Sequence, residues 1–82
     1  MPFNIIWDEK AFDQLNKLES VISKRIVKKI KELGESYPSG DIKKLKGQEG
    51  YRLRIGDYKA VFDIELDKII ILKVGHRKHI YD

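Results

Sequence analysis

The spacing of the apolar residues changes near Pro38, and this change limits the folds that the chain can adopt. Ahead of Pro38, one helix face is marked at three- and four-residue intervals by Ile22, Ile26, Ile30 and Leu33. Behind it, apolar and polar residues alternate from Tyr51 onward, as in a strand with one buried side. The sequence therefore predicts helices in the first half of the chain and strands in the second.

A strand and two helices are expected ahead of Pro38. Phe3–Trp7 is a short apolar run that predicts a strand, and Asp8 suits the N-cap of the helix that follows it. The apolar positions of this helix are Ala11, Phe12, Leu15 and Leu18. Ser20 can cap the second helix, and Gly34 with Pro38 is expected to mark its end. The pair forms a helical hairpin with one apolar face.

Four strands are expected in the second half, namely Ile42–Lys46, Tyr51–Ile55, Tyr58–Ile64 and Ile69–Val74. Gly56-Asp57 is a two-residue loop with glycine first, as a type II′ hairpin turn prefers, and Glu65–Asp67 is expected to be a three-residue turn. The predicted fold is α+β, in the order β-α-α-β-β-β-β. It is an antiparallel sheet, mixed at its N-terminal strand, with the helical hairpin packed on one face. Residues 1–82 are too few for a second core, so one domain is expected.

The first hairpin can be read in register around its loop. One face is then apolar and suited to meeting the helices; it holds Tyr51, Leu53, Ile55, Tyr58, Ala60, Phe62 and Ile64. The other face holds Arg52, Arg54, Lys59, Val61 and Asp63. Arg54 opposes Lys59 in this register, although like charges directly opposed across strands are destabilising. A phosphate-binding site would explain this pair of like charges. Solvated charges that are partly compensated by Asp57 and Asp63 explain it as well, and the pattern alone leaves both interpretations open.

The last strand adds cations to the same face if its turn has three residues. In that register the core face receives Ile70, Leu72 and Val74, and the cationic face receives Lys73, Gly75 and Arg77. A two-residue turn would bury Lys73, which disfavours it. The apolar side chains left on the cationic face are then Val61, Ile69 and Ile71. Exposed apolar residues of this kind suggest a surface that a protein partner covers.

Composition narrows the compartment and the partners. The sequence has no cysteine, which excludes a disulfide scaffold and thiolate metal sites. No apolar run approaches the ~20 residues of a membrane span, and Met1–Lys10 does not resemble a signal peptide, so a cytoplasmic protein that avoids membranes is expected. The net charge of +4 falls in residues 42–82, with ten basic and six acidic side chains, whereas residues 1–41 carry seven of each. A one-sided basic excess suggests a polyanionic partner such as nucleic acid.

The end of the chain and several lysines are the remaining candidates. His76 and His79 stand three apart without the cysteine or carboxylates that a metal site needs, so neither a metal nor a cofactor is expected. Tyr81 serves in packing or points its hydroxyl into the cationic face. The second helix carries a basic stripe, solvated or in contact with RNA backbone, of Lys24, Lys28 and Lys31 beside Arg25 and Lys29. Phosphate contact is favoured for Lys43, Lys44 and Lys46, because they lie near the cationic strands in sequence.

The segments YRLRIGDYKAVF at residues 51–62 and VGHRKHIY at residues 74–81 resemble the RelE/ParE toxin superfamily. Its members typically show a similar RIGDYR hairpin and a VGHR…VY ending, and the resemblance extends to chain length and element order. It implies the toxin of a type II toxin–antitoxin system, and within it a RelE-type endoribonuclease that cleaves messenger RNA in the ribosomal A site and so inhibits translation. Neither metal nor cofactor is implied. A RelB-like antitoxin is the implied protein partner, in a hetero-oligomeric complex.

The resemblance also implies the working residues. They fall on Arg52, Arg54, Lys59, Arg77 and Tyr81. His76 is a further catalytic candidate, because a histidine can act as a base. The charge pattern, rather than the resemblance, gives the RNA-binding candidates Lys44, Lys46, Lys73 and Lys78. The general base is expected to be Tyr81, with its pKa lowered by neighbouring cations, or His76. Lys59 departs from the family, which commonly has arginine there, and a lysine cannot form the bidentate fork to phosphate. The alternatives are a ParE-like toxin that inhibits DNA gyrase, a non-catalytic RNA-binding module, and a degenerate toxin kept within a repressor complex.

Overall fold

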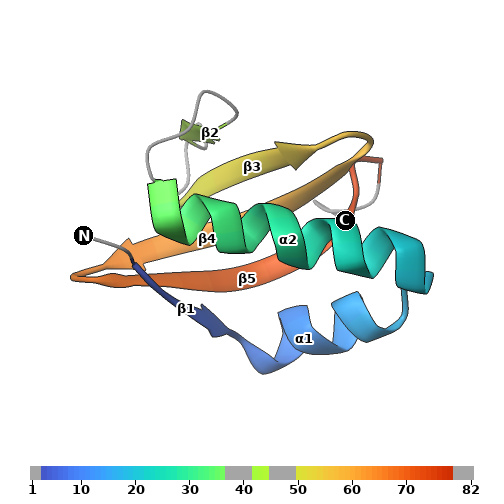
Figure 1. The fold of residues 1–82 in the computed structure, drawn as a ribbon, viewed down its shortest axis with the longest axis horizontal. Coiled ribbons are helices and arrows are strands. Elements are labelled where there is room, and N and C mark those ends of the chain that lie inside the picture. Colours follow the sequence, from blue (N-terminus) through green and yellow to red (C-terminus); the bar gives the residue numbers. More distant parts are fainter. Residues whose placement is uncertain (1–2, 37–41, 45–49, 79–82) are drawn as a thin grey trace.

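The structure is a computed structural model that describes residues 3–36, 42–44 and 50–78 (Figure 1). Its elements are β1 (Asn4–Trp7), α1 (Glu9–Asn16), α2 (Ser20–Ser36), β2 (Ile42–Lys44), β3 (Tyr51–Ile55), β4 (Tyr58–Glu65) and β5 (Lys68–His76). The predicted α+β class and the predicted order of elements are both confirmed.

The five strands form one sheet in the order β1-β5-β4-β3-β2. β1 pairs with β5 in parallel, whereas the other three pairings are antiparallel, so the sheet is mixed at its N-terminal strand as predicted. Both helices cover the same face of the sheet, with α1 beside β5 (Figure 1). No helix of the described residues covers the opposite face of the central strands.

The first helix begins as the sequence predicts but buries fewer of its apolar residues. The backbone N–H of Lys10 donates to Asp8 Oδ2 over 3.2 Å, which confirms Asp8 as the N-cap. Ala11 and Leu15 are buried, whereas Phe12 is 52% exposed, so its predicted place on the apolar face is wrong. A helix of eight residues buries only a narrow stripe of side chains against the sheet, and Phe12 lies outside that stripe.

The second helix buries the predicted stripe, and Gly34 has a different role from the one expected. Ile26 and Ile30 are almost fully buried, yet the helix runs past Gly34 to Ser36, so Gly34 does not end it. A Cβ at Gly34 would lie 2.9 Å from Ile5 Cδ1, and the Gly34 carbonyl accepts from Phe3 N–H over 2.7 Å. This glycine therefore lets α2 approach β1 closely. Pro38 lies outside the described residues.

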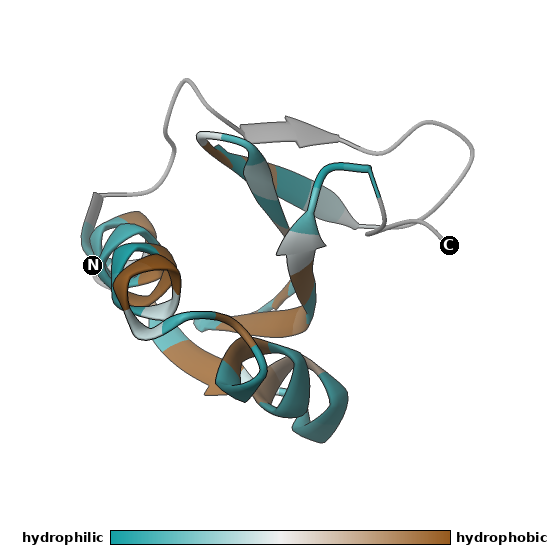
Figure 2. Ribbon diagram, turned by 90° about the vertical axis from the view of Figure 1, so that its right-hand side faces the viewer, coloured by the Kyte–Doolittle hydropathy of each residue, from teal (hydrophilic) through white to brown (hydrophobic). Residues whose placement is uncertain are grey.

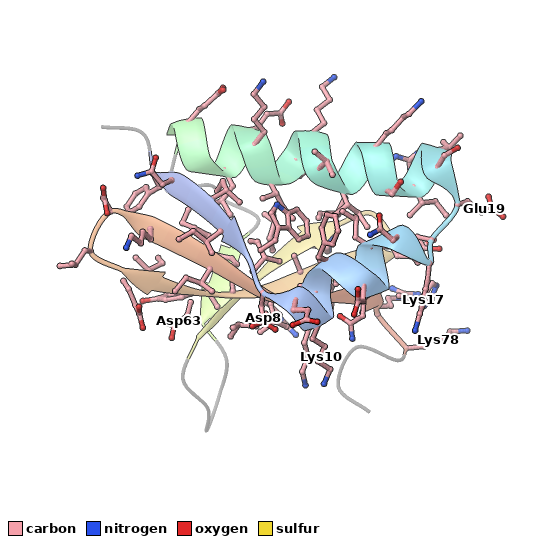
Figure 3. All side chains as sticks on the ribbon, turned by 90° about the horizontal axis from the view of Figure 1, so that it is seen from below. Asp8, Lys10, Lys17, Glu19, Asp63 and Lys78 are labelled. Carbon is pink, nitrogen blue, oxygen red and sulfur yellow. The ribbon has the colours of Figure 1, made fainter. Side chains whose placement is uncertain are left out.

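The core fills the space between the helices and the sheet. Apolar segments of α2 and of the strands face one another across this space (Figure 2). The largest fully buried side chains are Phe62, Ile26, Ile30, Leu53, Ile69 and Ile71. Figure 3 shows side chains with nitrogen and oxygen ends projecting from the side of α2 that faces away from the sheet. None of the helices in the described ranges is long and apolar enough to cross a membrane.

The first hairpin has the predicted register. Arg54 pairs with Lys59, on either side of the pairs that join Ile55 to Tyr58 and Leu53 to Ala60. Gly56 has a φ of +62°, which is the left-handed conformation that the first residue of a type II′ turn requires. Turn chemistry and alternation thus lead to one register.

The second hairpin, between β4 and β5, differs from the predicted one in its turn and its register. Glu65 pairs with Lys68, so the turn has two residues rather than three, and Ile69 and Ile71 are fully buried where Ile70 and Leu72 had been expected. The register shifts between Val61 and Phe62, because Leu72 is an additional residue in β5, a β-bulge. After the bulge Val74 is 3% exposed, as predicted for a core residue. The bulge keeps Lys73 out of the core, as the predicted three-residue turn would have done.

Candidate functional site

The side of the sheet turned away from the helices carries four cations in two rows. One row runs across three strands through Arg54, Lys59 and Gly75, and the next runs through Arg52, Val61 and Lys73. We call this surface, with Arg52, Arg54, Lys59 and Lys73, the cationic face. Directly opposed residues in such rows stand about 5 Å apart, and the two rows about 7 Å apart. The four charges are therefore close enough to act on one or two neighbouring phosphates.

The cations differ in their contact with water. Arg54 is exposed, whereas Arg52, Lys59 and Lys73 are half-buried. A half-buried cation keeps less of its hydration, so an arriving phosphate displaces less water from it. Lys59 stands opposite Gly75, and a Cβ built at Gly75 meets no atom of the described residues within 4 Å. The row thus has open space next to its central lysine.

Asp63 is the acidic side chain at the border of the cationic face. It lies on the side of the sheet away from α2 (Figure 3). Its Oδ1 accepts from the backbone N–H of Ile64 over 2.9 Å. The carboxylate is two residues from Val61 along β4, so it borders the row of Arg52 rather than that of Arg54 and Lys59. It therefore reduces the positive potential least at the Arg54 end.

Arg77 follows β5 and lies at the Arg54 end of the cationic face. Its backbone N–H donates to the carbonyl of Asp57 over 2.9 Å, which ties it to the loop of the first hairpin. Arg54 and Lys59 are the second residues on either side of that loop. The structure therefore brings Arg77 to the end of the sheet where the row of Arg54 and Lys59 lies.

His76 occupies the other side of the sheet. It pairs with Tyr58, and the two rings meet edge to face with centroids 5.3 Å apart. Tyr58 packs against the core, so the register position of His76 belongs to the helix-facing side. His76 Nδ1 accepts from the backbone N–H of Lys78 over 3.2 Å. Lys78 itself is exposed and extends outward beyond the end of β5 (Figure 3).

Three of the predicted residues are only partly placed or not placed. Tyr81 and Lys46 lie outside the described residues. Lys44 is described by its backbone alone, which pairs with Tyr51 at the end of the β2–β3 ladder. In the described ranges, no three histidine, aspartate or glutamate side chains come together in a group that could hold a metal ion.

A groove between α2 and the end of β3 extends the positive surface around the edge of the sheet. It has a volume of about 390 Å³, and its lining residues are Arg25, Lys28, Lys29, Glu32, Arg54, Ile55 and Gly56. Arg54 therefore belongs both to the cationic face and to this groove. The sequence predicted a basic stripe on α2 but did not show that it lies next to Arg54.

Gln14 makes a contact that no feature of the sequence predicts. The backbone N–H of Val74 in β5 donates to Gln14 Oε1 over 3.0 Å. The two residues are 60 positions apart, and no motif marks a glutamine in α1. Only the tertiary structure brings them together.

Comparison with known proteins gives the chain clear relatives. A family described as the ParE toxin of type II toxin–antitoxin systems matches residues 5–81. A toxin named RelE3 from Methanocaldococcus jannaschii is 49% identical over 43 residues, 51% of this chain. The matched part spans about half the length of that curated relative, 49%.

Two solved structures are similar over almost the whole chain. The RelBE2 toxin–antitoxin complex of Mycobacterium tuberculosis contains a chain with a TM-score of 0.83 and 26% identity, covering 94% of this chain and 100% of that one. The RelB–RelE complex of Methanococcus jannaschii contains one with a TM-score of 0.77 and 36% identity, covering 94% and 95% of the two chains. Both similar structures are antitoxin–toxin complexes.

Proposed function

Because the chain belongs to the ParE toxin family of type II toxin–antitoxin systems, within the RelE/ParE superfamily, we propose that it acts as a RelE-type toxin that cleaves messenger RNA on the ribosome. One observation carries the proposal: Arg52, Arg54, Lys59 and Lys73 share the face of the sheet opposite α1 and α2. Arg54 opposite Lys59 weakens the sheet, and a bound phosphate between them offsets the repulsion.

The proposed reaction uses the 2′-hydroxyl of the RNA as the nucleophile. Its oxygen attacks the adjacent phosphorus in line, and the bond from phosphorus to the 5′-oxygen breaks, which gives a cyclic phosphate and a free 5′-hydroxyl. The 2′-hydroxyl gives its proton to a base, and the departing 5′-oxygen takes one up. Arg54 and Arg77 hold the non-bridging oxygens, whose charge grows in the transition state. Arg52 and Lys59 add positive field.

For the general base we propose Tyr81 rather than His76. The support comes from His76: its Nδ1 accepts from Lys78 N–H, so the proton of the neutral ring sits on Nε2. The ring also packs against Tyr58 on the helix-facing side. Both features suit a histidine that orders the end of β5 better than one that takes a proton from RNA.

The partners follow from the same proposal. The similar structures are toxins in complex with RelB antitoxins, and we propose that a RelB-like antitoxin binds this chain and blocks the cationic face. The basic groove beside α2 adds contacts to the ribosomal RNA backbone. A toxin that acts on translating ribosomes works in the cytoplasm.

The second candidate is a toxin that inhibits DNA gyrase, and the ParE description of the matched family favours it. Four cations gathered on one sheet face favour an RNA phosphate as the target instead. A gyrase supercoiling assay run beside an in vitro translation assay separates the two activities.

The proposal is tested by mapping cuts on translated messenger RNA by primer extension. Wild-type protein is expected to cut within codons on the ribosome, and added chelator is expected to leave the cutting unchanged. Arg77→Ala is expected to abolish it while the far-ultraviolet circular dichroism stays native. Lys68→Ala, an exposed lysine at the opposite end of β5, is the matched control. Undiminished cutting by folded Arg77→Ala would exclude the assigned site, and inhibition of gyrase without RNA cuts would exclude the ribonuclease.

A further inference from the structure

The bulge in β5 decides which residues at the end of the chain join the cationic face. Before it, Ile69 and Ile71 face the helices and are fully buried. Leu72 is the additional residue, because Phe62 pairs with Ile71 while Val61 pairs with Lys73. After it the alternation is reversed. Val74 is now buried, and Lys73 lies beside Val61 on the cationic face.

A strand without the bulge would expose a different set of side chains. Alternation continued from Ile71 would turn Lys73 into the core. It would also bring His76, instead of Arg77, to the face of Arg54 and Lys59. A slip of one residue exchanges every later side chain between the two faces of a sheet. The proposed site therefore depends on this one register shift.

Gln14 contacts the backbone just after the bulge. β1 ends at Trp7, opposite Ile71, so α1 lies where a strand would otherwise border β5. The Ile71 carbonyl faces that border, since it accepts from Asp8 N–H over 2.9 Å. Strict alternation from Ile71 would turn the amide of Lys73 to the same border. It is the amide of Val74 that donates to Gln14 Oε1, over 3.0 Å, and this hydrogen bond therefore belongs to the bulged register.

We propose that Gln14 is a positioning residue for RNA cleavage: by accepting from the Val74 amide, it holds the bulged register that keeps Lys73 and Arg77 on the cationic face. Gln14 acts from the opposite side of β5 and through the backbone. Its effect on cleavage rests on the proposed ribonuclease function. Its effect on the placement of the two cations does not.

The placement is tested on the protein alone by amide hydrogen exchange. Gln14→Ala is expected to speed exchange of the Val74 amide about tenfold, because the amide loses its acceptor. Gln14→Glu keeps an oxygen there and is expected to restore slow exchange. Asp13→Ala, at the exposed neighbouring position of α1, is the matched control and leaves exchange unchanged. Unchanged Val74 exchange in folded Gln14→Ala would overturn the inference.

The consequence for cleavage is tested with ribosome-bound messenger RNA. Gln14→Ala is expected to lower kcat between about tenfold and about 100-fold with little change in KM, since small displacements of a charged group are costly. Gln14→Glu is expected to recover most of the activity. The losses from Gln14→Ala and Lys73→Ala are expected to be smaller together than their product, because Gln14 acts in part through the placement of Lys73. Independent losses, or no recovery in Gln14→Glu, would contradict the role. A wild-type protein that cuts no RNA would overturn the ribonuclease proposal, and Val74 exchange would still decide whether Gln14 holds the register.

Discussion

The two hairpins share β4, yet they hold their registers in different ways. The β3–β4 hairpin keeps one register from Tyr51 to Ile55, whereas the β4–β5 hairpin shifts register between Val61 and Phe62. Both turn on two residues, the first of which is left-handed: Gly56 at φ +62° and Leu66 at φ +55°. Glycine adopts this conformation without strain, and leucine does not.

The difference lies in where the restraints come from. The first hairpin is specified by its own residues, through a glycine turn and an alternation of apolar and polar side chains that is interrupted at Val61. The second is held from outside, by Asp8 N–H on the Ile71 carbonyl and by Gln14 on the Val74 amide. Cations of the proposed site thus come from a locally specified hairpin and from a strand whose register depends on α1 and β1.

The largest effect on stability is expected when the side chain of Phe62, which lies in the strand shared by both hairpins, is removed. Phe62 is fully buried, stacks on Tyr51 with ring centroids 5.6 Å apart, and pairs with Ile71 on its other side. Phe62→Ala is expected to lower the free energy of unfolding by about 3–5 kcal/mol, as large cavities in a core do. Urea unfolding measures the loss. Phe12→Ala is the matched control, since Phe12 is half-exposed, and an equal loss there would contradict the described core.

The next prediction compares a cation of the first hairpin with a cation that follows the bulge in β5. Arg54→Ala, in the locally specified hairpin, is expected to lower cleavage of ribosome-bound RNA by about 10²–10³-fold, the range for one lost transition-state donor. Lys73→Ala, after the bulge, is expected to cost less because a lysine is a single point charge at the neighbouring row. Single-turnover rates measure both. A larger loss in Lys73→Ala would place the scissile phosphate nearer to β5 than we propose.

A smaller effect is expected at the first turn. Gly56→Ala introduces a Cβ that meets no atom within 4 Å, so its cost comes from the left-handed backbone alone, about 1–2 kcal/mol. Gly75→Ala is the matched control, because its Cβ also meets no atom and Gly75 lies in a regular strand. Thermal unfolding distinguishes them. Equal stability of the two variants would mean that Gly56 does not require the left-handed conformation.

The smallest effect is expected at the second turn and has the opposite sign. Leu66 is 93% exposed, so its side chain contributes little packing to offset its strained backbone. Leu66→Asn is expected to stabilise the protein by about 0.5–1 kcal/mol, because asparagine tolerates the left-handed region. Leu66→Ala removes the same side chain without that tolerance and serves as the control. If both variants were equally stable, backbone strain at Leu66 would be ruled out as the cause.

The sequence predicted the position of those site residues that pair with residues close to them in the chain. Arg54 and Lys59 lie on either side of a glycine turn, so their opposition followed from counting residues outward from Gly56. Arg77 was expected on the cationic face by way of a three-residue turn, which the structure replaces with a two-residue turn and a bulge. For His76, alternation along β5 already placed it on the opposite side from Arg77.

The sequence by itself determined the α+β order, the face that each residue of the first hairpin occupies, and the charge that the site carries, because these follow from periodicity and turn chemistry within a few residues. The tertiary structure alone decided the register of β5, the role of Gly34 and the contact of Gln14, because each depends on an element distant in the chain. A bulge satisfies local alternation on both of its sides. We expect the bulge to fall at Leu72 because Gln14 of α1 accepts from the Val74 amide, a contact between residues 60 positions apart.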